Sequence, residues 1–199
     1  MNTFIDITKS HRRMIYGVGI NDAPYPIKGC PYYSVWKDMV RRTVSNKYKQ
    51  KYPSYNECTL DPRWVKFMNF RQWAEENGYK KGMHLDKDLL IPGNKLYGPD
   101  TCLLVSAELN KHLQFNHSLQ SKPIGVRFIS ANKTNPYYAQ CKRNGKEYYI
   151  GVFPTEQKAI DAYYKVKEDI ILEFVEKETN PKVKNALMSY CNNIREYIK

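Results

Sequence analysis

The chain has 199 residues, which is enough for one ordinary domain or two small ones and too few for a large single-core enzyme. With 42% hydrophobic and 26% charged residues, it is expected to fold around a core. The 32 Lys and Arg residues outnumber the 20 Asp and Glu residues, so the formal net charge is +12. An excess of this size favours a polyanionic partner, with nucleic acid ahead of a membrane surface.

Three other classes of protein are disfavoured: membrane-spanning proteins, secreted proteins, and proteins stabilised by disulfides or zinc. No stretch approaches the roughly 20 apolar residues that a membrane-spanning helix needs. The polar, basic start of the chain lacks the apolar centre of a secretory signal, so we expect no membrane partner and a cytoplasmic location. The five cysteines are widely spaced and form no CxxC or CxH pair, which argues against disulfides and structural zinc.

The first part of the chain predicts an extended lead-in followed by helices. Residues 1–33 are rich in Pro, Gly and Tyr. One amphipathic helix is expected from about Ser34, and a second from Asp61-Pro62, a cap and first-turn proline, to Asn77-Gly78. The aromatic stripe of the second helix is assigned to the core: Trp64, Phe67, Phe70 and Trp73.

A run of lysines extends the first predicted helix. Lys47, Lys49 and Lys51 alternate with polar and aromatic residues. We interpret them as a solvated face. The alternative is that they add contacts to nucleic-acid phosphates, which would weaken as salt rises.

Residues 82–116 predict a strand, a loop with a Pro-Gly turn, a second strand and a short helix capped by Ser106. From Pro123 onward, three alternating runs predict a three-stranded antiparallel sheet, because Asn144-Gly145 between the last two is a strong hairpin signal. Thr155 is expected to cap a helix that covers one side of this sheet. Asn180-Pro181 then begins a last helix.

The predicted sheet is locally positive. Between Pro123 and Ile150 it has five basic residues and one acid, Glu147, whereas the following helix carries most of the acids of this region. A cationic sheet face opposite an acidic helix suits contact with phosphates, and a solvated sheet surface is the alternative. Period-two alternation places Gln140 and Lys142 on one strand face, as a reader of DNA requires.

The runs GVRF, YYAQCKR, YYIGVF and TEQKAIDAYY resemble the plant ethylene-response-factor DNA-binding domain over about 50 residues. The resemblance implies a sheet that lies in the major groove of double-stranded DNA. It assigns DNA contacts to Arg127, Gln140, Lys142 and Tyr149. The chain departs from the family pattern with Gln140 for Glu, Tyr149 for Trp, Ile129 for Arg and Glu147 for a basic residue, which weakens the expectation of strong sequence specificity.

Residues 82–112 resemble in outline the HNH nuclease finger, a strand, loop, strand and helix that hold a divalent cation. In that register, Asp86 and Asn110 match metal ligands, for Mg²⁺ or another divalent ion. Lys87 falls on the general-base His, and Thr101 on the middle Asn. A Lys is mostly protonated at neutral pH and is unsuited to be the base.

Other residues can replace the missing base. A protonated Lys87 would instead stabilise the phosphate, which leaves His84 or His112 as the base, with His84 favoured. Because residues two apart share a strand face, His84, Asp86 and Asp88 could meet at one cation. A hydrogen-bonded surface histidine and a solvated charge cluster are the alternatives for these residues.

The segments YSVWKDMVRRT, PSYNECTLDPRWVKFMNFRQWAEENG and HLDKDLLIPGNKLYGPDTC also resemble phage-encoded HNH proteins, a group that often has the same Lys and Thr. We therefore expect an α+β protein, with a helical and HNH-like (ββα) module followed by a three-stranded antiparallel sheet packed on a helix. The expected boundaries are 1–33 for the lead-in, 34–120 for the HNH-like module, 123–178 for the DNA-binding domain and 181–199 for the last helix.

Three functions follow from these expectations. The first is a phage-type HNH homing endonuclease that cleaves or nicks double-stranded DNA with a divalent metal in the host cytoplasm. The second is a catalytically inactive DNA-binding or regulatory protein that keeps the HNH scaffold. The third is a phage protein that docks on a host protein through its basic surface.

Overall fold

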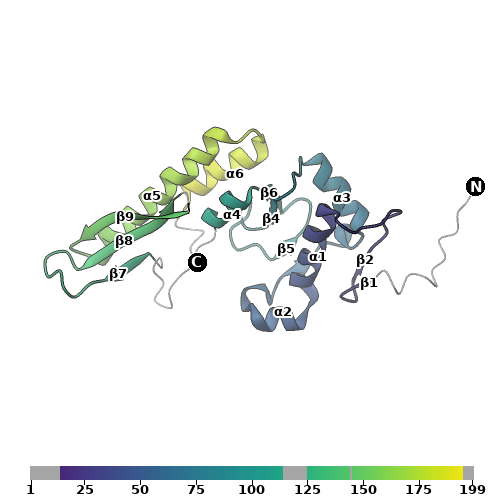
Figure 1. Cartoon of the computed structure of the whole chain (residues 1–199), viewed down its shortest axis with the longest axis horizontal. Coiled ribbons are helices and arrows are strands. Elements are labelled where there is room, and N and C mark those ends of the chain that lie inside the picture. The colour runs from purple at the N-terminus through teal and green to yellow at the C-terminus, as the bar shows by residue number, and fades with distance from the viewer. Residues whose placement is uncertain (1–13, 114–124, 144, 195–199) are drawn as a thin grey trace, which may run out of the picture. The chain divides into compact units, whose positions relative to one another are not determined.

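The computed structural model of the chain describes residues 14–113, 125–143 and 145–194. It divides into two compact units, Met1–Ala107 and Glu108–Lys199. Helices and strands are present in both (Figure 1), which confirms the α+β class. Among the described residues, no helix is both long enough and apolar enough to cross a membrane.

The first unit begins with a small hairpin where an extended lead-in was expected. Strands β1 (Met14–Ile15) and β2 (Gly19–Ile20) pair antiparallel. Residues 1–13 of the predicted lead-in lie outside the described residues. Helix α1 (Pro31–Val44) starts three residues before the predicted Ser34, with Pro31 in the first turn. A proline fits there because its fixed φ suits the helix and its missing N–H would have no helical partner.

The helix expected to start at Asp61 is split into two pieces. Asp61 caps a single 3₁₀ turn, Pro62–Trp64, by accepting from the Arg63 amide at 2.9 Å. Helix α3 (Phe67–Glu76) begins only after an extended Lys66. A distant segment engages the backbone at this break: the Ile20 amide donates to the Val65 carbonyl at 2.8 Å, and Ile20 forms a bridge with the extended Lys66.

Aromatic side chains form the core of the first unit. The stripe predicted for the second helix belongs to it, with Trp73 only partly buried at its edge. Trp36, Trp64, Phe67 and Phe70 are almost completely buried. The Trp36 indole donates to the Trp64 carbonyl at 2.8 Å, so the buried ring also satisfies its polar atom. This contact ties α1 to the segment that precedes α3.

The lysine run lies on a separate short helix. Ser45 has extended backbone angles and ends α1; its hydroxyl then accepts from the Tyr48 amide and caps helix α2 (Asn46–Lys51). A 3₁₀ turn, η2 (Pro53–Tyr55), follows. The chain thereby turns away from the line of α1, because a serine cap at this point offers the backbone an alternative to continued helix.

Two small sheets complete the first unit. Strand β4 (His84–Asp86) pairs antiparallel with β6 (Leu103–Val105). Strand β3 (Thr59–Leu60) pairs parallel with β5 (Leu96–Tyr97), a pairing that no local pattern predicts. Helix α4 (Ala107–Leu113) follows β6 directly, so the predicted order of strand, loop, strand and helix is confirmed. Its assignment to the HNH finger stays a prediction.

The second unit contains the predicted three-stranded antiparallel sheet. Strand β8 (Tyr137–Arg143) lies between β7 (Val126–Phe128) and β9 (Lys146–Phe153). Helix α5 (Glu156–Lys177), capped by Thr155 as predicted, packs along one face of the sheet (Figure 1). Helix α6 (Pro181–Asn192) starts at an Asn180 cap, and Ile198 of the predicted last helix lies outside the described residues.

Small residues bring the sheet and α5 close together. Ala139 of β8 and Ala159 of α5 are both fully buried and meet with Val126 in the centre of this core. Gly125, just before β7, accepts a hydrogen bond from the Gln140 amide at 2.9 Å. A Cβ on Gly125 would collide with the Gln140 carbonyl and lie 2.9 Å from the Tyr163 ring. This glycine is therefore required by close packing.

Gly125→Ala is expected to lower the free energy of unfolding of the second unit by about 2–3 kcal/mol, because the added methyl displaces either backbone or the Tyr163 ring. Urea unfolding followed by circular dichroism measures the change. Ser130→Ala, at an exposed position, is the control and should change it by less than about 0.5 kcal/mol. Equal stability of both variants would contradict the packing argument.

Candidate functional site

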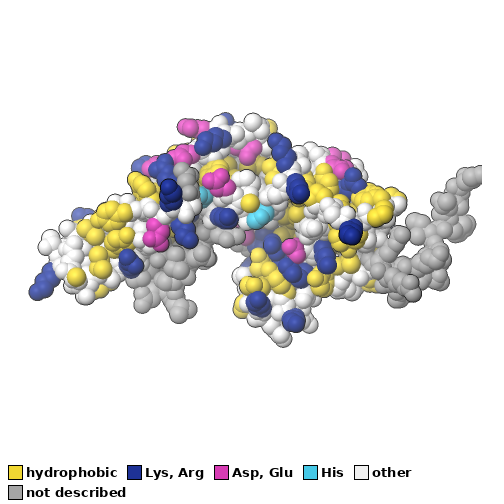
Figure 2. Space-filling view, in the orientation of Figure 1, with side chains coloured by type: hydrophobic (Ala, Val, Ile, Leu, Met, Phe, Trp, Pro, Cys, Tyr) yellow, Lys and Arg dark blue, Asp and Glu magenta, His cyan; other side chains and the backbone are white. Residues whose placement is uncertain are grey.

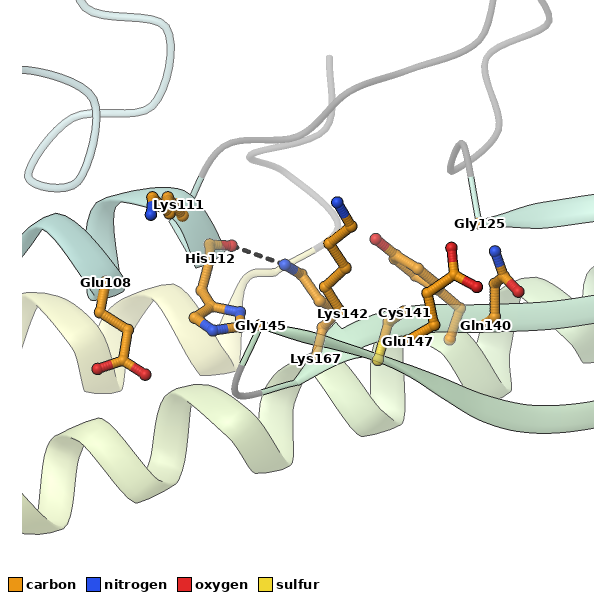
Figure 3. Close-up of a pocket in the computed structure, with 11 residues that line it drawn as sticks. Glu108, Lys111, His112, Gly125, Gln140, Cys141, Lys142, Gly145, Glu147 and Lys167 are labelled. Atoms are coloured by element: carbon orange, nitrogen blue, oxygen red, sulfur yellow. Dashed lines mark hydrogen bonds between the residues drawn. The ribbon is translucent and has the colours of Figure 1, made fainter.

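The sheet of the second unit has one face that α5 leaves open. Strand alternation sends Ala139 and Cys141 of β8 toward α5, and both are buried. Gln140 and Lys142 therefore point to the opposite side. Figure 3 shows this directly: the ends of Gln140, Lys142 and Glu147 extend away from α5, whereas the Cys141 sulfur points toward it.

The register places the other two predicted DNA contacts on the same open face. Arg127 of β7 pairs with Tyr138, and Tyr149 of β9 pairs with Gln140. Tyr138 and Gln140 lie two apart on β8 and share a face. The structure thus brings Arg127, Gln140, Lys142 and Tyr149 together on one surface drawn from three strands.

Side-chain contacts connect this surface. The Arg127 guanidinium lies over the Tyr138 ring, 4.5 Å from its centroid. The Tyr138 hydroxyl donates to Gln140 Oε1 at 2.8 Å, and the Tyr138 and Tyr149 rings lie 5.4 Å apart. We call Arg127, Tyr138, Gln140, Lys142 and Tyr149 the open-face cluster. Sequence reasoning missed Tyr138, although its position two residues before Gln140 was a usable signal.

The open-face cluster is accessible and its charges are mainly positive. Arg127 and Lys142 are exposed, and the Tyr149 ring is 57% exposed. Glu147 pairs with Lys142 in the register and is the acid of this face. On the covered side, Arg143 forms an ion pair with Glu173 of α5. That ion pair neutralises an arginine on the covered side. The positive charge of the open face comes from Arg127 and Lys142.

A cavity of about 650 Å³ lies at the end of β8 that β7 does not reach. Charged residues of both signs line it, including Glu108, Lys111, Lys142 and Glu147. Lys167 reaches from α5 and donates to the His112 carbonyl at 2.8 Å, at the end of α4 (Figure 3). A lysine near the last carbonyls of a helix is a favourable cap, so this contact holds α4 on α5.

Burial affects both residues of this contact. It lowers the pKa of the Lys167 ammonium below its ordinary value. It also lowers the pKa of His112, and the nearby Lys167 adds to the effect. The His112 ring packs against Phe174, 5.6 Å between centroids. Both side chains are thus part of the packing between helices, and we propose no catalytic base at His112.

The predicted nuclease residues of the first unit start on β4. His84 and Asp86 share its outer face, because Leu85 between them is buried in the core. His84 is exposed and Asp86 is half-buried. Asp86 Oδ1 accepts from the Leu89 amide at 2.7 Å and from the Asp88 amide at 3.0 Å. The carboxylate therefore shapes the turn that follows the strand.

The Lys87 side chain is enclosed by the loop that follows β4. Its side chain is only 10% exposed, and its Nζ donates to Asp88 Oδ1 at 2.6 Å and to the Asn94 carbonyl at 2.7 Å. Asn94 returns the contact by donating to the Lys87 carbonyl at 2.9 Å. Lys87 and Asn94 thus bind the two ends of this loop. Asn94 was missed by sequence reasoning, although it follows the recognised Pro-Gly turn.

Thr101 has a comparable role at the far side of the loop. Its hydroxyl donates to the Leu96 carbonyl at 2.7 Å. A threonine at the position that matches the middle Asn of the HNH pattern therefore still holds loop backbone here. The predicted helix ligand Asn110 lies on α4 and belongs to the second unit, whereas Asp86 belongs to the first.

These side chains offer few ligands to a divalent cation. Within the described ranges, no group of three or more His, Cys, Asp or Glu side chains is placed to hold a metal ion. Asp88, expected beside His84 and Asp86, is instead paired with Lys87. The Asp86 carboxylate then remains on the outer face of β4 as an oxygen ligand, and Mg²⁺ would need water and phosphate for its other positions.

The environment of Asp86 predicts the effect of removing its charge. Burial raises the pKa of this carboxyl, although the two backbone amides oppose the shift. A group whose pKa is raised by folding stabilises the protein below its unfolded pKa and loses this contribution as pH rises through the folded value. The charged form at neutral pH is thus unfavourable for the fold.

Asp86→Asn keeps an oxygen to accept from both amides and removes the charge of this half-buried carboxyl. We expect the free energy of unfolding of the variant, minus that of the wild-type protein, to increase as the pH rises from 4.5 to 7.5. Denaturant unfolding at several pH values measures the difference, with Glu176→Gln at an exposed position as the control. A relative stability that falls over this range would contradict the assignment.

Comparisons of the chain with protein-family models, with curated proteins and with solved structures found no match. The resemblances to ethylene-response-factor domains and HNH proteins therefore stay predictions.

Proposed function

We propose that the chain binds double-stranded DNA through the open-face cluster of the second unit. One observation carries this proposal: Arg127, Gln140, Lys142 and Tyr149, to which the family resemblance assigns DNA contacts, lie on the sheet face that α5 does not cover. Arg, Lys and an exposed aromatic ring on a single rigid face suit contact with phosphates and bases.

The side chains of the cluster have complementary tasks in such a complex. Arg127 and Lys142 are exposed cations for phosphate oxygens. The Gln140 amide can pair with an adenine edge, since its oxygen keeps a second lone pair besides the one used by Tyr138. Tyr138 contacts both Arg127 and Gln140 and orders their side chains before binding, so less side-chain freedom is lost in the complex.

The distribution of charge supports the same orientation. The acids of this region lie mainly on α5, which packs on the opposite face. A duplex approaching the open face meets cations first and stays away from the carboxylates of the helix. The formal net charge of +12 adds a long-range attraction that steers the encounter.

Replacing Arg127 and Lys142 by Ala is expected to weaken binding of duplex DNA about tenfold or more near 0.15 M salt. The slope of log Kobs against log salt should become smaller by about two, since each lost phosphate contact removes about 0.9. Fluorescence anisotropy with a labelled duplex measures both quantities.

The matched control replaces Lys158 and Lys165 of α5 by Ala, which removes the same charge from the other side of the sheet. This variant should lose much less affinity. Equal losses in the two variants would show that only net charge matters and would contradict the proposed interface. Unchanged binding in both would do so as well.

A second candidate function is divalent-metal-dependent cleavage of the bound DNA. It is favoured by the shared outer face of His84 and Asp86, at the start of a loop fixed by its own hydrogen bonds. Asp86 would hold the ion, with phosphate and water as its other ligands, and the ion would stabilise charge at phosphorus. His84 would take the proton from water. Lys87 is left out, because its ammonium is bound inside the loop.

Cleavage is tested by incubating supercoiled plasmid with the protein and Mg²⁺ or Mn²⁺. The original chain should produce nicked circles, and His84→Gln and Asp86→Asn should each reduce the rate about 100-fold or more. Binding of duplex DNA by these variants is measured as the control. If the original chain binds DNA and makes no nicks with either metal, the non-catalytic alternative is correct.

A further inference from the structure

We propose that the first unit carries a second surface for duplex DNA, formed by the end of α1, α2 and η2. The surface consists of Arg41, Arg42, Lys47, Lys49 and Lys51 with the rings of Tyr48, Tyr52 and Tyr55. We call it the α2 surface. It adds a phosphate-binding site to the proposed function, which so far involves the second unit alone.

The charge of this segment is strongly one-sided. Residues 39–56 contain these five cations and no Asp or Glu. In the described part of the chain, Arg41 alone of the five lies within ion-pair distance of a carboxylate, Asp38 at 2.9 Å. Its charge is thus partly balanced. Arg42 is largely enclosed, with a buried Nε, so Lys47, Lys49 and Lys51 supply most of the positive charge of the surface. Figure 2 shows Lys and Arg side chains interleaved with hydrophobic side chains over the region of α2.

Aromatic rings lie against three of these cations. The Arg41 guanidinium lies 4.8 Å from the centroid of Tyr48, and that of Arg42 lies 5.6 Å from Tyr55. The Lys51 ammonium lies 5.3 Å from the centroid of Tyr52. A ring positions a cation without cancelling its charge, so the exposed Lys51 ammonium keeps its full charge for an external anion.

The rings themselves form one cluster. Tyr48 lies 4.7 Å from Tyr52 and 5.6 Å from Tyr55, centroid to centroid. Lys49 fastens the segment to its neighbours by donating to the Asn56 and Cys58 carbonyls at 3.1 and 3.2 Å. These contacts order the cations before binding, which lowers the entropy that a complex must lose.

Duplex DNA is the partner that this arrangement fits. The exposed cations Lys47 and Lys51 lie four residues apart on α2, and one face of a helix presents such residues side by side. A row of cations matches the regular phosphates of a duplex backbone, and such contacts need no particular base sequence. The surface therefore predicts sequence-independent affinity in addition to the contacts of the open-face cluster.

The test uses the full chain with Lys47→Gln and Lys51→Gln together. Neither side chain makes the backbone contacts that Lys49 makes, so the fold should be preserved, as a thermal unfolding curve will verify. We expect the slope of log Kobs against log salt for a duplex to fall by about one to two. The control variant Lys80→Gln with Lys81→Gln removes the same charge at exposed positions outside the surface and should leave the slope unchanged.

A second measurement separates this inference from the proposed function. Lysines are acetylated with and without duplex DNA, and the modified residues are identified by mass spectrometry. DNA should protect Lys47 and Lys51 and leave Lys80 and Lys81 reactive. Protection of Lys142 alone would overturn the α2 surface and keep the open-face proposal. Protection of Lys47 and Lys51 without Lys142 would keep the α2 surface and overturn the open-face proposal.

An acidic membrane is the competing polyanion, and the same variants test it. Vesicles containing phosphatidylserine are added to the original chain in a flotation assay. Binding of vesicles that depends on Lys47 and Lys51, together with an unchanged salt slope for DNA, would overturn the inference.

Discussion

The account depends on how α5 packs against the C-terminal sheet. Small residues at the contact, Ala139, Ala159 and Gly125, let the helix lie close to the strands and bury one face. Because side chains alternate along a strand, Tyr138, Gln140 and Lys142 of β8 then point to the opposite face. A cationic and aromatic surface results from the same packing that stabilises the unit, and it is held rigid by Tyr138 between Arg127 and Gln140.

Local patterns predicted the second unit well. The Asn-Gly turn, the period-two alternation and the Thr155 cap are short-range signals, and the sheet and α5 follow them. They failed in the first unit wherever a distant segment determines the backbone. Ile20 binds the Val65 carbonyl and interrupts a helix that the aromatic spacing predicts as continuous, and the parallel pairing of β3 with β5 joins segments that have no local signal for each other.

In the candidate sites, too, residues placed by a local pattern could be predicted, and residues placed by distant segments could not. Residues on regular strands, such as Gln140 and Lys142, could be assigned to a face from the sequence because their period is fixed. Lys87 could not, since its position depends on where the loop brings Asn94. The phosphate role proposed for Lys87 is replaced by a structural one, whereas the lysines of α2, first interpreted as a solvated face, gain a proposed role from the tyrosines that surround them.

Nuclear magnetic resonance of the full chain, titrated with a short duplex, tests the central claim most directly. The account predicts that amide and side-chain signals of Arg127, Gln140, Lys142 and Tyr149 shift on addition of DNA and that the effect weakens as salt rises. Signals of the exposed face of α5, including Lys158, should stay in place. Shifts confined to α5, or a sheet that does not respond to the duplex, would contradict it.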